Sequence, residues 1–435
     1  MASSLLGVVK IEELRKRIIF TLLMLVIYRA GVHIPTPGVD GEALKTVFEN
    51  MRGTIFGIFN LFSGGALERF SIFALGIAPY ISASIIVQLL TVVIPQFHEW
   101  QKEGEQGRKR LTQITRYGTV LLCIVQGGGL AFQLQSQTSP KVVLNPGFSF
   151  VAMTVLTLMA GTLFLMWVGE QLSERGVGNG TSLLIFGGIA AGIPNALGSA
   201  YGLVNSGELS VFKLILLAVV ILATFYIIIF VERGQRRIPI QYAKRVVGRS
   251  VYGGQNSHLP LKVNVSGVIP PIFASSLIMF PATFAVVTNS TFVQKLSQQL
   301  MPGQYLYEIF FVGLIVFFCY FYTAVAFKTD DVTENLKRNG GFIPGIRPGE
   351  PTAEYIDYVL GRITLGGAVY IASICVLPTL LTENLKVPFY FGGTSVLILV
   401  GVALDTVAQV ETFLISRNYD GFMKHVRIRG RAAAS

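Results

Sequence analysis

Ten long apolar runs constrain this chain more than any other feature of its sequence. A helix that crosses the hydrocarbon core of a bilayer needs about 20 mostly apolar residues. Runs of this kind cover residues 18–35, 71–95, 117–134, 150–170, 181–201, 211–231, 265–288, 307–327, 360–381 and 393–415. They are continuously apolar, whereas the strands of a membrane β-barrel alternate apolar and polar residues over about 10 positions. The sequence therefore predicts an all-α integral membrane protein with ten transmembrane helices.

The composition supports a membrane environment. Only 14% of the 435 residues are charged, 52% are hydrophobic, and the mean hydropathy is +0.59. Soluble domains carry about 25% charged residues. The net charge of +11 predicts anionic lipid, nucleic acid or acidic protein as a neighbour. The three cysteines are unclustered and the four histidines are far apart, so neither a disulfide framework nor a metal site is predicted.

Lysine and arginine are distributed unevenly between the two sides of the predicted bundle. If the N-terminus is cytosolic, the cytosolic segments hold 27 of the 35 basic residues and the opposite side holds six. An excess of basic residues marks the cytosolic side of a membrane protein, so we expect both termini in the cytosol. The first apolar run follows a charged segment and has no small-residue cleavage site after it. No cleavable signal peptide is therefore expected.

Two of the apolar runs open with a similar motif. Gly76–Ser84 reads GIAPYISAS, and Gly267–Ser275 reads GVIPPIFAS. Each motif lies in the second run of a group of five, and the two runs are expected to cross the membrane in opposite directions. This pattern indicates an inverted repeat around a central pathway, with halves 1–205 and 206–435. Chance similarity between two helix starts that contain Gly and Pro is the alternative.

The interiors of the predicted helices are nearly free of ionisable residues. Asp405 and Glu411 in the last run are the main exceptions. Ion and proton transporters need such groups inside the membrane, so a relay of that kind is disfavoured. Two interpretations remain: a pathway for large cargo that apolar side chains close by dewetting, or a structural membrane subunit. Ile77, Ile81 and Ile272 suit such a constriction, although each of them alone also suits ordinary packing.

A shorter apolar segment precedes the second run. Residues 53–62 read GTIFGIFNLF, which is too short to cross the membrane, and SGGA at 63–66 forms a flexible joint. A short apolar helix on such a joint could fold into a pore and plug it. It could equally lie on the outer leaflet as an interfacial helix.

Two long cytosolic loops, at about 232–264 and 328–358, are rich in arginine. Alternation over residues 238–251 predicts a short hairpin in the first loop, and GGFIPGIRPGE at 340–350 predicts a rigid exposed turn in the second. Such loops suit docking to RNA phosphates or acidic proteins. The alternative is that they only set topology and contact lipid headgroups. Because no nucleotide-binding or catalytic motif is present, the energy for transport would come from a partner, and no enzyme activity is expected.

Seven segments carry a resemblance to a known family. They are FNLFSGGALERFSIFALGIAPYISASIIVQLLTVV, KEGEQGRKRLTQITRYG, GEQLSERGVGNGTS, VERGQRRIPIQYAKR, HLPLKVNVSGVIPPIFASS, GGFIPGIRPGEPTAEYID and VPFYFGGTS. Through them the chain resembles the SecY family, the channel subunits of the bacterial Sec translocon, over nearly its whole length. The resemblance implies a ten-helix clamshell of two pseudo-symmetric inverted halves around a central pore in the bacterial inner membrane. Such a channel moves unfolded secretory polypeptides across the membrane and releases transmembrane segments sideways into it.

The resemblance also implies roles for particular residues. The pore ring comprises Ile77, Ile81, Thr181, Ile185, Ile272 and Ile398. The plug, at about 54–68, includes Ile55, Phe56, Ile58, Phe59, Leu61, Phe62, Gly64 and Gly65. Gln88 and Asn264 lie on the lateral gate between the second and seventh helices, where their burial favours a mutual hydrogen bond in the closed state. The docking residues are Arg236, Arg237, Arg249 and Arg347.

Thr181 departs from the isoleucine that is usual at its position in the family. Its hydroxyl either makes the ring more polar or bonds the backbone of its own helix and leaves the methyl group facing the pore. The partners implied by the resemblance are the SecE and SecG subunits, the SecA motor ATPase, the ribosome with its rRNA, signal sequences, nascent polypeptides and anionic lipids. No cofactor is expected. A small-solute secondary transporter and a membrane scaffold are the alternative functions.

Overall fold

A helix overlaps each of the ten predicted runs in the computed structural model, which describes residues 11–51, 60, 63–137, 141–207, 210–242, 245–247, 250–252, 256–287, 299, 304–385 and 393–425. These helices are α2 (Glu12–Gly31), α5 (Ala78–Val93), α7 (Glu105–Ser136), α8 (Phe148–Arg175), α9 (Gly180–Asn205), α10 (Val211–Glu232), α11 (Ile269–Val287), α13 (Tyr305–Ala326), α15 (Glu350–Leu385) and α16 (Gly393–His425). Three shorter helices are α3 (Gly41–Met51), α6 (Pro95–Lys102) and α14 (Thr329–Arg338).

The described helices give the chain the character of a multi-pass membrane protein. Seven of them are long and apolar enough to cross a bilayer, or eight if α5 and α6 form one span. Those two helices meet at a bend of 100°. The bend follows from the sequence, because the residue before a proline disfavours the helical region and Ile94, which precedes Pro95, is extended.

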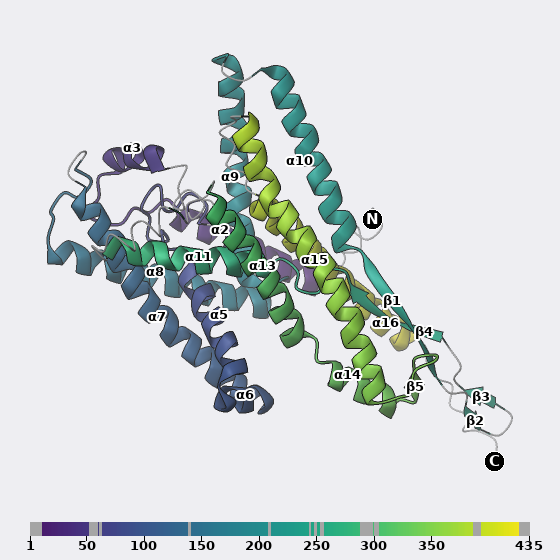
Figure 1. The fold of residues 1–435 in the computed structure, drawn as a ribbon. Coiled ribbons are helices and arrows are strands. Elements are labelled where there is room, and N and C mark those ends of the chain that lie inside the picture. Colours follow the sequence, from purple (N-terminus) through teal and green to yellow (C-terminus); the bar gives the residue numbers. More distant parts are fainter. Residues whose placement is uncertain are drawn as a thin grey trace.

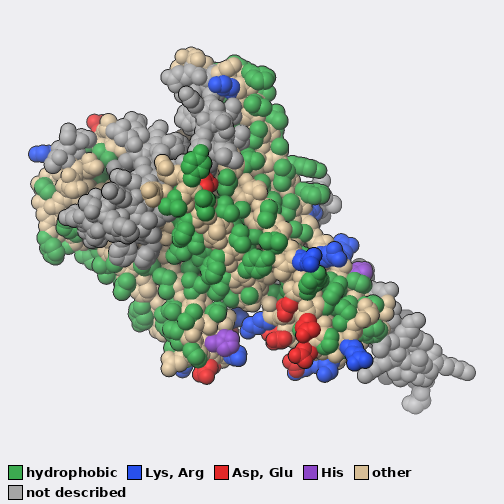
Figure 2. Space-filling model, viewed as in Figure 1, with side chains coloured by type: hydrophobic (Ala, Val, Ile, Leu, Met, Phe, Trp, Pro, Cys, Tyr) green, Lys and Arg blue, Asp and Glu red, His purple; other side chains and the backbone are tan. Residues whose placement is uncertain are grey.

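Charged and apolar side chains occupy different zones of the surface. In Figure 1, α6, α14 and the strands lie toward one end of the molecule, whereas α3 lies toward the other. Figure 2 shows hydrophobic side chains across the middle and charged ones gathered at the end that carries α6 and α14. Phe212 and Phe230 of α10 and Ile309 of α13 are each at least 70% exposed. Such a belt fits a lipid surround, which replaces water around apolar side chains.

The helices pack as two groups that follow the chain order. In the first group, α7 packs against α5 and α8, and α8 against α9. In the second group, α11 packs against α13, α13 against α15, and α16 against α10 and α15. The groups meet where α11 contacts α5 and α7, and where α16 contacts α9. One large apolar cluster contains buried residues from both groups, so the centre of the molecule lies at their junction.

A small sheet joins the two arginine-rich loops. Strand β1 (Gln235–Tyr242) lies between β4 (Asn256–Lys262) and β5 (Gly341–Phe342), and all pairs are antiparallel. Strands β2 (Arg245–Val247) and β3 (Ser250–Tyr252) form a separate pair farther out. We call β1, β4, β5, the turn at 343–349 and the start of α15 the strand module.

The hairpin is longer than the prediction of 238–251, since its paired strands run from Gln235 to Lys262. The reason is burial. Ile238 and Leu261 pack in an apolar cluster with Ile343 and Ile356, which come from the other loop and from α15. Sequence alternation within one loop does not reveal a core that is shared with another segment. The two loops are therefore parts of one compact unit.

Close helix packing depends on glycine at several positions, of which Gly161 in α8 is the clearest. A Cβ atom built on Gly161 would lie 1.9 Å from the carbonyl oxygen of Ile72, in the segment that leads into α5. Small residues allow such close approach between membrane segments. Because the obstacle is a backbone atom, a side chain at this position cannot be accommodated by a rotamer change.

We therefore expect Gly161→Ala to destabilise the protein by about 1–3 kcal/mol, the usual cost of overpacking. The matched control is Gly192→Ala in α9, where nothing lies within 4 Å of the added Cβ. That control should be neutral or stabilising, because alanine is the better helix former. Thermal unfolding of the two purified variants in detergent measures the difference. Equal melting temperatures would contradict the predicted close contact.

Candidate functional site

The two sequence motifs adopt the same local structure. Gly76 and Gly267 both have positive φ, at +56° and +61°, a region that suits glycine. Two residues later α5 begins at Ala78 and α11 begins at Ile269, each with a proline in its first turn. Proline is favoured there because the first helical N–H groups have no partner within the helix. The shared geometry supports the interpretation of the motifs as a repeat.

A small cavity lies where the two motifs meet. Its lining comprises Ser63, Leu75, Gly76, Ile77, Ala78, Ile81, Ile185, Ile272, Ser275 and Ser276. Ile81 and Ile272 occupy the same offset from the glycines of their motifs. The free volume is about 30 Å³. At roughly 10–15 Å³ of such volume per water molecule, the cavity has room for two or three. The site is thus a small cavity formed mostly by aliphatic side chains.

Four of the six predicted ring residues line this cavity, and two do not. Ile398 of α16 is fully buried in the apolar cluster that also contains Ile185 and Ile272. Thr181 lies one helical turn before Ile185. The structure therefore places Ile398 and Thr181 close to the ring but outside the lining of the cavity.

The Thr181 hydroxyl has a local partner. It donates a hydrogen bond of 2.7 Å to Oδ1 of Asn179, the residue that caps the N-terminus of α9. A Cβ built on Gly169 would lie 3.4 Å from the methyl carbon of Thr181 and 3.6 Å from Cδ1 of Ile77, so the methyl group is near Ile77. The expected bond from this hydroxyl to the backbone of its own helix is therefore wrong, because the acceptor is the side chain of Asn179.

The glycine joint after the short apolar segment is held against α2 by two hydrogen bonds. Gly64 and Gly65 have φ values of +67° and +84°. Tyr28 donates from its hydroxyl to the carbonyl oxygen of Ser63 at 3.1 Å, and Arg29 donates to that of Gly64. The other predicted plug residues lie outside the described part of the chain: Ile55, Phe56, Ile58, Phe59, Leu61 and Phe62. The described end of this segment, at Ser63, is part of the cavity wall.

The expected hydrogen bond between Gln88 and Asn264 is wrong. Gln88 donates instead to Oγ of Ser84 within its own helix, at 3.5 Å. Asn264 lies five residues before α11 and bonds Glu232, Ser266 and Gly267. Because its donors and acceptor are all occupied by groups of its own half, it has no capacity left for Gln88. The two helices that carry the predicted gate, α5 and α11, do pack against each other.

Three of the four predicted docking arginines belong to the strand module. Arg236 and Arg237 are exposed on β1, and Arg347 is exposed on the turn after β5. The backbone oxygen of Arg347 accepts a hydrogen bond of 2.8 Å from Oγ1 of Thr352, which fixes the turn to α15. Arg249 lies outside the described residues. Pairing of β1 with β5 thus places arginines of both loops on one module.

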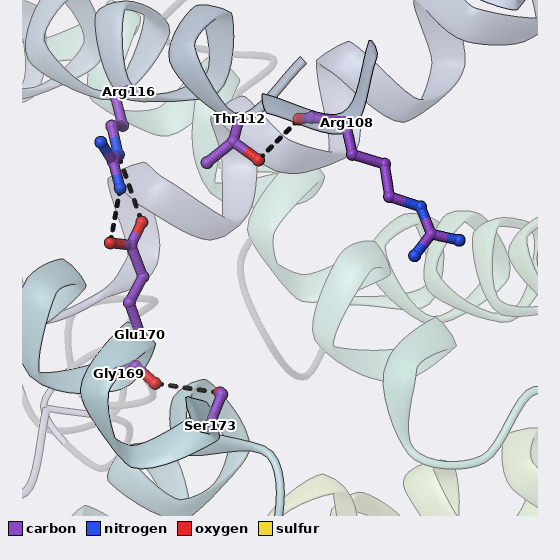
Figure 3. A network of polar contacts seen from close by, with 6 residues as sticks. All are labelled: Arg108, Thr112, Arg116, Gly169, Glu170 and Ser173. Carbon is purple, nitrogen blue, oxygen red and sulfur yellow. Dashed lines mark hydrogen bonds and ion pairs between the residues drawn. The ribbon is translucent and has the colours of Figure 1, made fainter. Parts of the chain in front are cut away.

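A polar brace that the sequence analysis did not identify joins α7, α8 and α9. Arg116 donates two hydrogen bonds to the carboxylate of Glu170, at 3.2 and 2.7 Å (Figure 3). Ser173 donates to the carbonyl oxygen of Gly169 and accepts from the N–H of Gly180 at the start of α9. The sequence signal for this pair is that Arg116 directly precedes the run 117–134 and Glu170 ends the run 150–170, so both are predicted on the same side of the membrane. The brace fixes the helix that carries Ile185.

Within the described residues, no group of three or more His, Cys, Asp or Glu side chains could hold a metal ion. The site therefore combines a small cavity lined mostly by aliphatic side chains, a packing contact between α5 and α11, and an exposed basic module.

Comparison with known proteins identifies the family. Residues 71–407 match the SecY family. The chain is 51% identical over 423 residues to the protein translocase subunit SecY of Escherichia coli K12, which is 96% of both chains. It is 45% identical over 428 residues to the subunit of the same name from Aquifex aeolicus, covering 98% of this chain and 100% of that one.

Solved structures show the same fold at much lower sequence identity. One is described as the structure of a protein-conducting channel, with a TM-score of 0.65, 16% identity and coverage of 92% of this chain and 93% of that one. Another is the Sec61 chain of a canine ribosome–channel complex, with a TM-score of 0.62, 14% identity and the same coverage. On the sequence match over most of its length, the chain belongs to the SecY family.

Proposed function

We propose that this chain is the pore-forming subunit of a protein translocase in the bacterial inner membrane. It passes unfolded secretory polypeptides across the membrane and releases transmembrane segments sideways into the bilayer. The observation that carries the proposal is the convergence of Ile77, Ile81, Ile185 and Ile272 on one small cavity between the two repeats. The names of the relatives, which are translocase subunits, and of the solved structures, which include a protein-conducting channel, support it.

The isoleucine junction can act as a gasket. An apolar constriction excludes ions without any charged gate, because a narrow apolar passage does not hold water. Dispersion and hydrophobic contacts are non-directional, so the same side chains can close around an extended polypeptide of any sequence. Thr181 and Ile398 support the ring from behind in this proposal. The plug at about 54–68 closes the outer side.

The lateral gate in this proposal lies between α5 and α11. Ile85 of α5 and Ile278 of α11 are buried in the same apolar cluster, at 3% and 3% exposure. A signal sequence is itself an apolar helix, so it can replace such contacts with similar ones when it enters between α5 and α11. Opening then separates the halves 1–205 and 206–435.

The strand module serves as the docking surface for the ribosome and the SecA motor ATPase. Its exposed arginines suit phosphates and carboxylates, and one structure of the same fold is a ribosome–channel complex. The excess of basic residues at the predicted inner side supports a cytosolic location for the module and both termini. SecE and SecG are the proposed accessory subunits, and anionic lipids are the proposed surround.

The gasket role predicts that smaller side chains at the junction will let ions pass. Replacing Ile81, Ile185 and Ile272 together with glycine should raise ion leak in proteoliposomes. Lowering the permeation barrier by about 1.4 kcal/mol already gives a tenfold faster leak. Ion flux across vesicles that contain the purified complex measures the effect.

The matched control replaces Ile19, Ile215 and Ile309 with glycine, because these isoleucines are 55%, 58% and 71% exposed on outward helix faces. This variant carries the same number of helix-destabilising changes, but its leak should stay at the level of the unmodified protein. If the junction variant leaks no more than the control and selects signal sequences as stringently as before, the gasket role is wrong.

The docking role predicts that reversing one charge on the strand module weakens partner binding. Arg347→Glu should lower the affinity for SecA about tenfold, the scale of one charged contact, and impair SecA-driven transport of a secretory protein. Arg175→Glu, an exposed change of the same charge at the end of α8, is the control and should have little effect. Full transport by the Arg347→Glu variant would contradict the assignment.

A further inference from the structure

Asn264 sits in a buried turn where its side chain uses all its hydrogen-bonding capacity. It is 3% exposed. Its Nδ2 donates to Oε1 of Glu232 at 2.6 Å and to the carbonyl oxygen of Gly267 at 3.0 Å. Its Oδ1 accepts from Oγ of Ser266 and from the N–H of Gly267, both at 3.0 Å. An amide offers two donors and two acceptor sites, so none is left over.

The bond to Glu232 differs from the others, because it spans 32 residues of chain. Glu232 is the last residue of α10, and Asn264 follows the end of β4 at Lys262. The two side chains therefore close the base of the hairpin, next to the backbone bond from the N–H of Val263 to the carbonyl oxygen of Gly234. A hydrogen bond to a carboxylate is about twice as strong as one between neutral groups.

The link from Asn264 to α11 packs against α15 and α16. A Cβ on Gly367 of α15 would lie 3.0 Å from the carbonyl oxygen of Val263. A Cβ on Gly401 of α16 would lie 2.2 Å from the side chain of Val268, so only glycine leaves room for that valine. Close packing transmits displacement, because a dense interior cannot absorb it.

Beyond this link, α11 reaches the pore. It begins at Ile269, carries the cavity residues Ile272, Ser275 and Ser276, and packs against α5 across the proposed gate. At its other end the link continues into β4, which pairs with the arginine-bearing strand β1. Asn264 thus lies in the segment that connects β4 of the strand module to α11, and Glu232 at the end of α10 bonds it there.

We propose that Glu232 and Asn264 form a clasp that makes the strand module and α11 move as one body, so that docking on the module shifts the gate. Both are positioning residues in this role, which rests on the proposed function of the module. Without the clasp, the hairpin base can shift relative to α11, and docking no longer biases the gate. The remaining bonds of Asn264 hold only the local turn.

The turn and the clasp can be separated by mutation. Glu232→Ala removes the clasp and leaves the three local bonds of Asn264. The single change Glu232→Gln keeps a neutral form of the clasp, because the glutamine oxygen can still accept from Nδ2 of Asn264, and it leaves the three local bonds in place. Glu174→Gln, an exposed carboxylate on the same predicted side of the membrane, is the control.

The experiment measures gate position and docking in the same samples. Spin labels replace Ile86 of α5 and Leu277 of α11, which are 42% and 39% exposed and occupy the same offset in the two repeats. The full translocon is reconstituted in lipid nanodiscs, and the distance between the labels is measured with and without saturating bacterial ribosomes. Ribosome affinity is measured alongside.

We expect ribosomes to shift the label distance in the unmodified and Glu174→Gln proteins. In Glu232→Ala with ribosome bound, the ratio of open to closed gate should fall about tenfold, the scale of one lost charged hydrogen bond. The affinity for the ribosome should stay unchanged. Glu232→Gln, which keeps a neutral acceptor for Asn264, should retain most of the shift. If ribosomes shift the label distance in Glu232→Ala as much as in the unmodified protein, the clasp proposal is wrong. If the unmodified protein does not bind ribosomes, the proposed docking function is rejected, and the clasp role is rejected with it.

Discussion

The packing of a few isoleucine side chains where the two repeats meet is the interaction on which the proposed channel depends. A channel wide enough for a polypeptide must be sealed when idle, and charged or polar gates would bind particular sequences. Aliphatic side chains seal without such preference, because their contacts are non-directional. The cavity between the two motifs has a free volume of only about 30 Å³. The brace of Arg116 and Glu170 positions α9, the helix that carries Ile185 at this junction, through α8.

The arrangement around the junction separates a fixed part from a movable part. The pair of Arg116 with Glu170, and the bonds of Ser173, hold α7, α8 and α9 together in the first half. The contact of α5 with α11 lies within an apolar cluster and is easier to exchange for other apolar contacts. The strand module connects to α11 through residues 263–268, and α11 contacts both α5 at the proposed gate and α7 of the braced helices.

Much of this fold could be predicted from the sequence, because long apolar runs and positive-inside charge are properties of single segments. The shared offset of Ile81 and Ile272 could also be predicted, since both follow a Gly-x-x-Pro motif. The partner of Asn264 could not. A buried amide takes the nearest unsatisfied group, and Glu232 becomes its neighbour only when the hairpin closes. The joint core of the two loops, with Ile238 against Ile343, likewise depends on a contact between distant segments.

The most direct test of the central claim asks whether a moving polypeptide touches the junction. A photoreactive amino acid is placed at Ile81 or Ile272, and in separate samples at the outward-facing Ile215 or Ile309. A secretory precursor is then arrested partway through the channel and the sample is illuminated. The account predicts crosslinks from Ile81 and Ile272 to the arrested chain and none from Ile215 or Ile309. Crosslinks from the outward positions but not from the junction would contradict it.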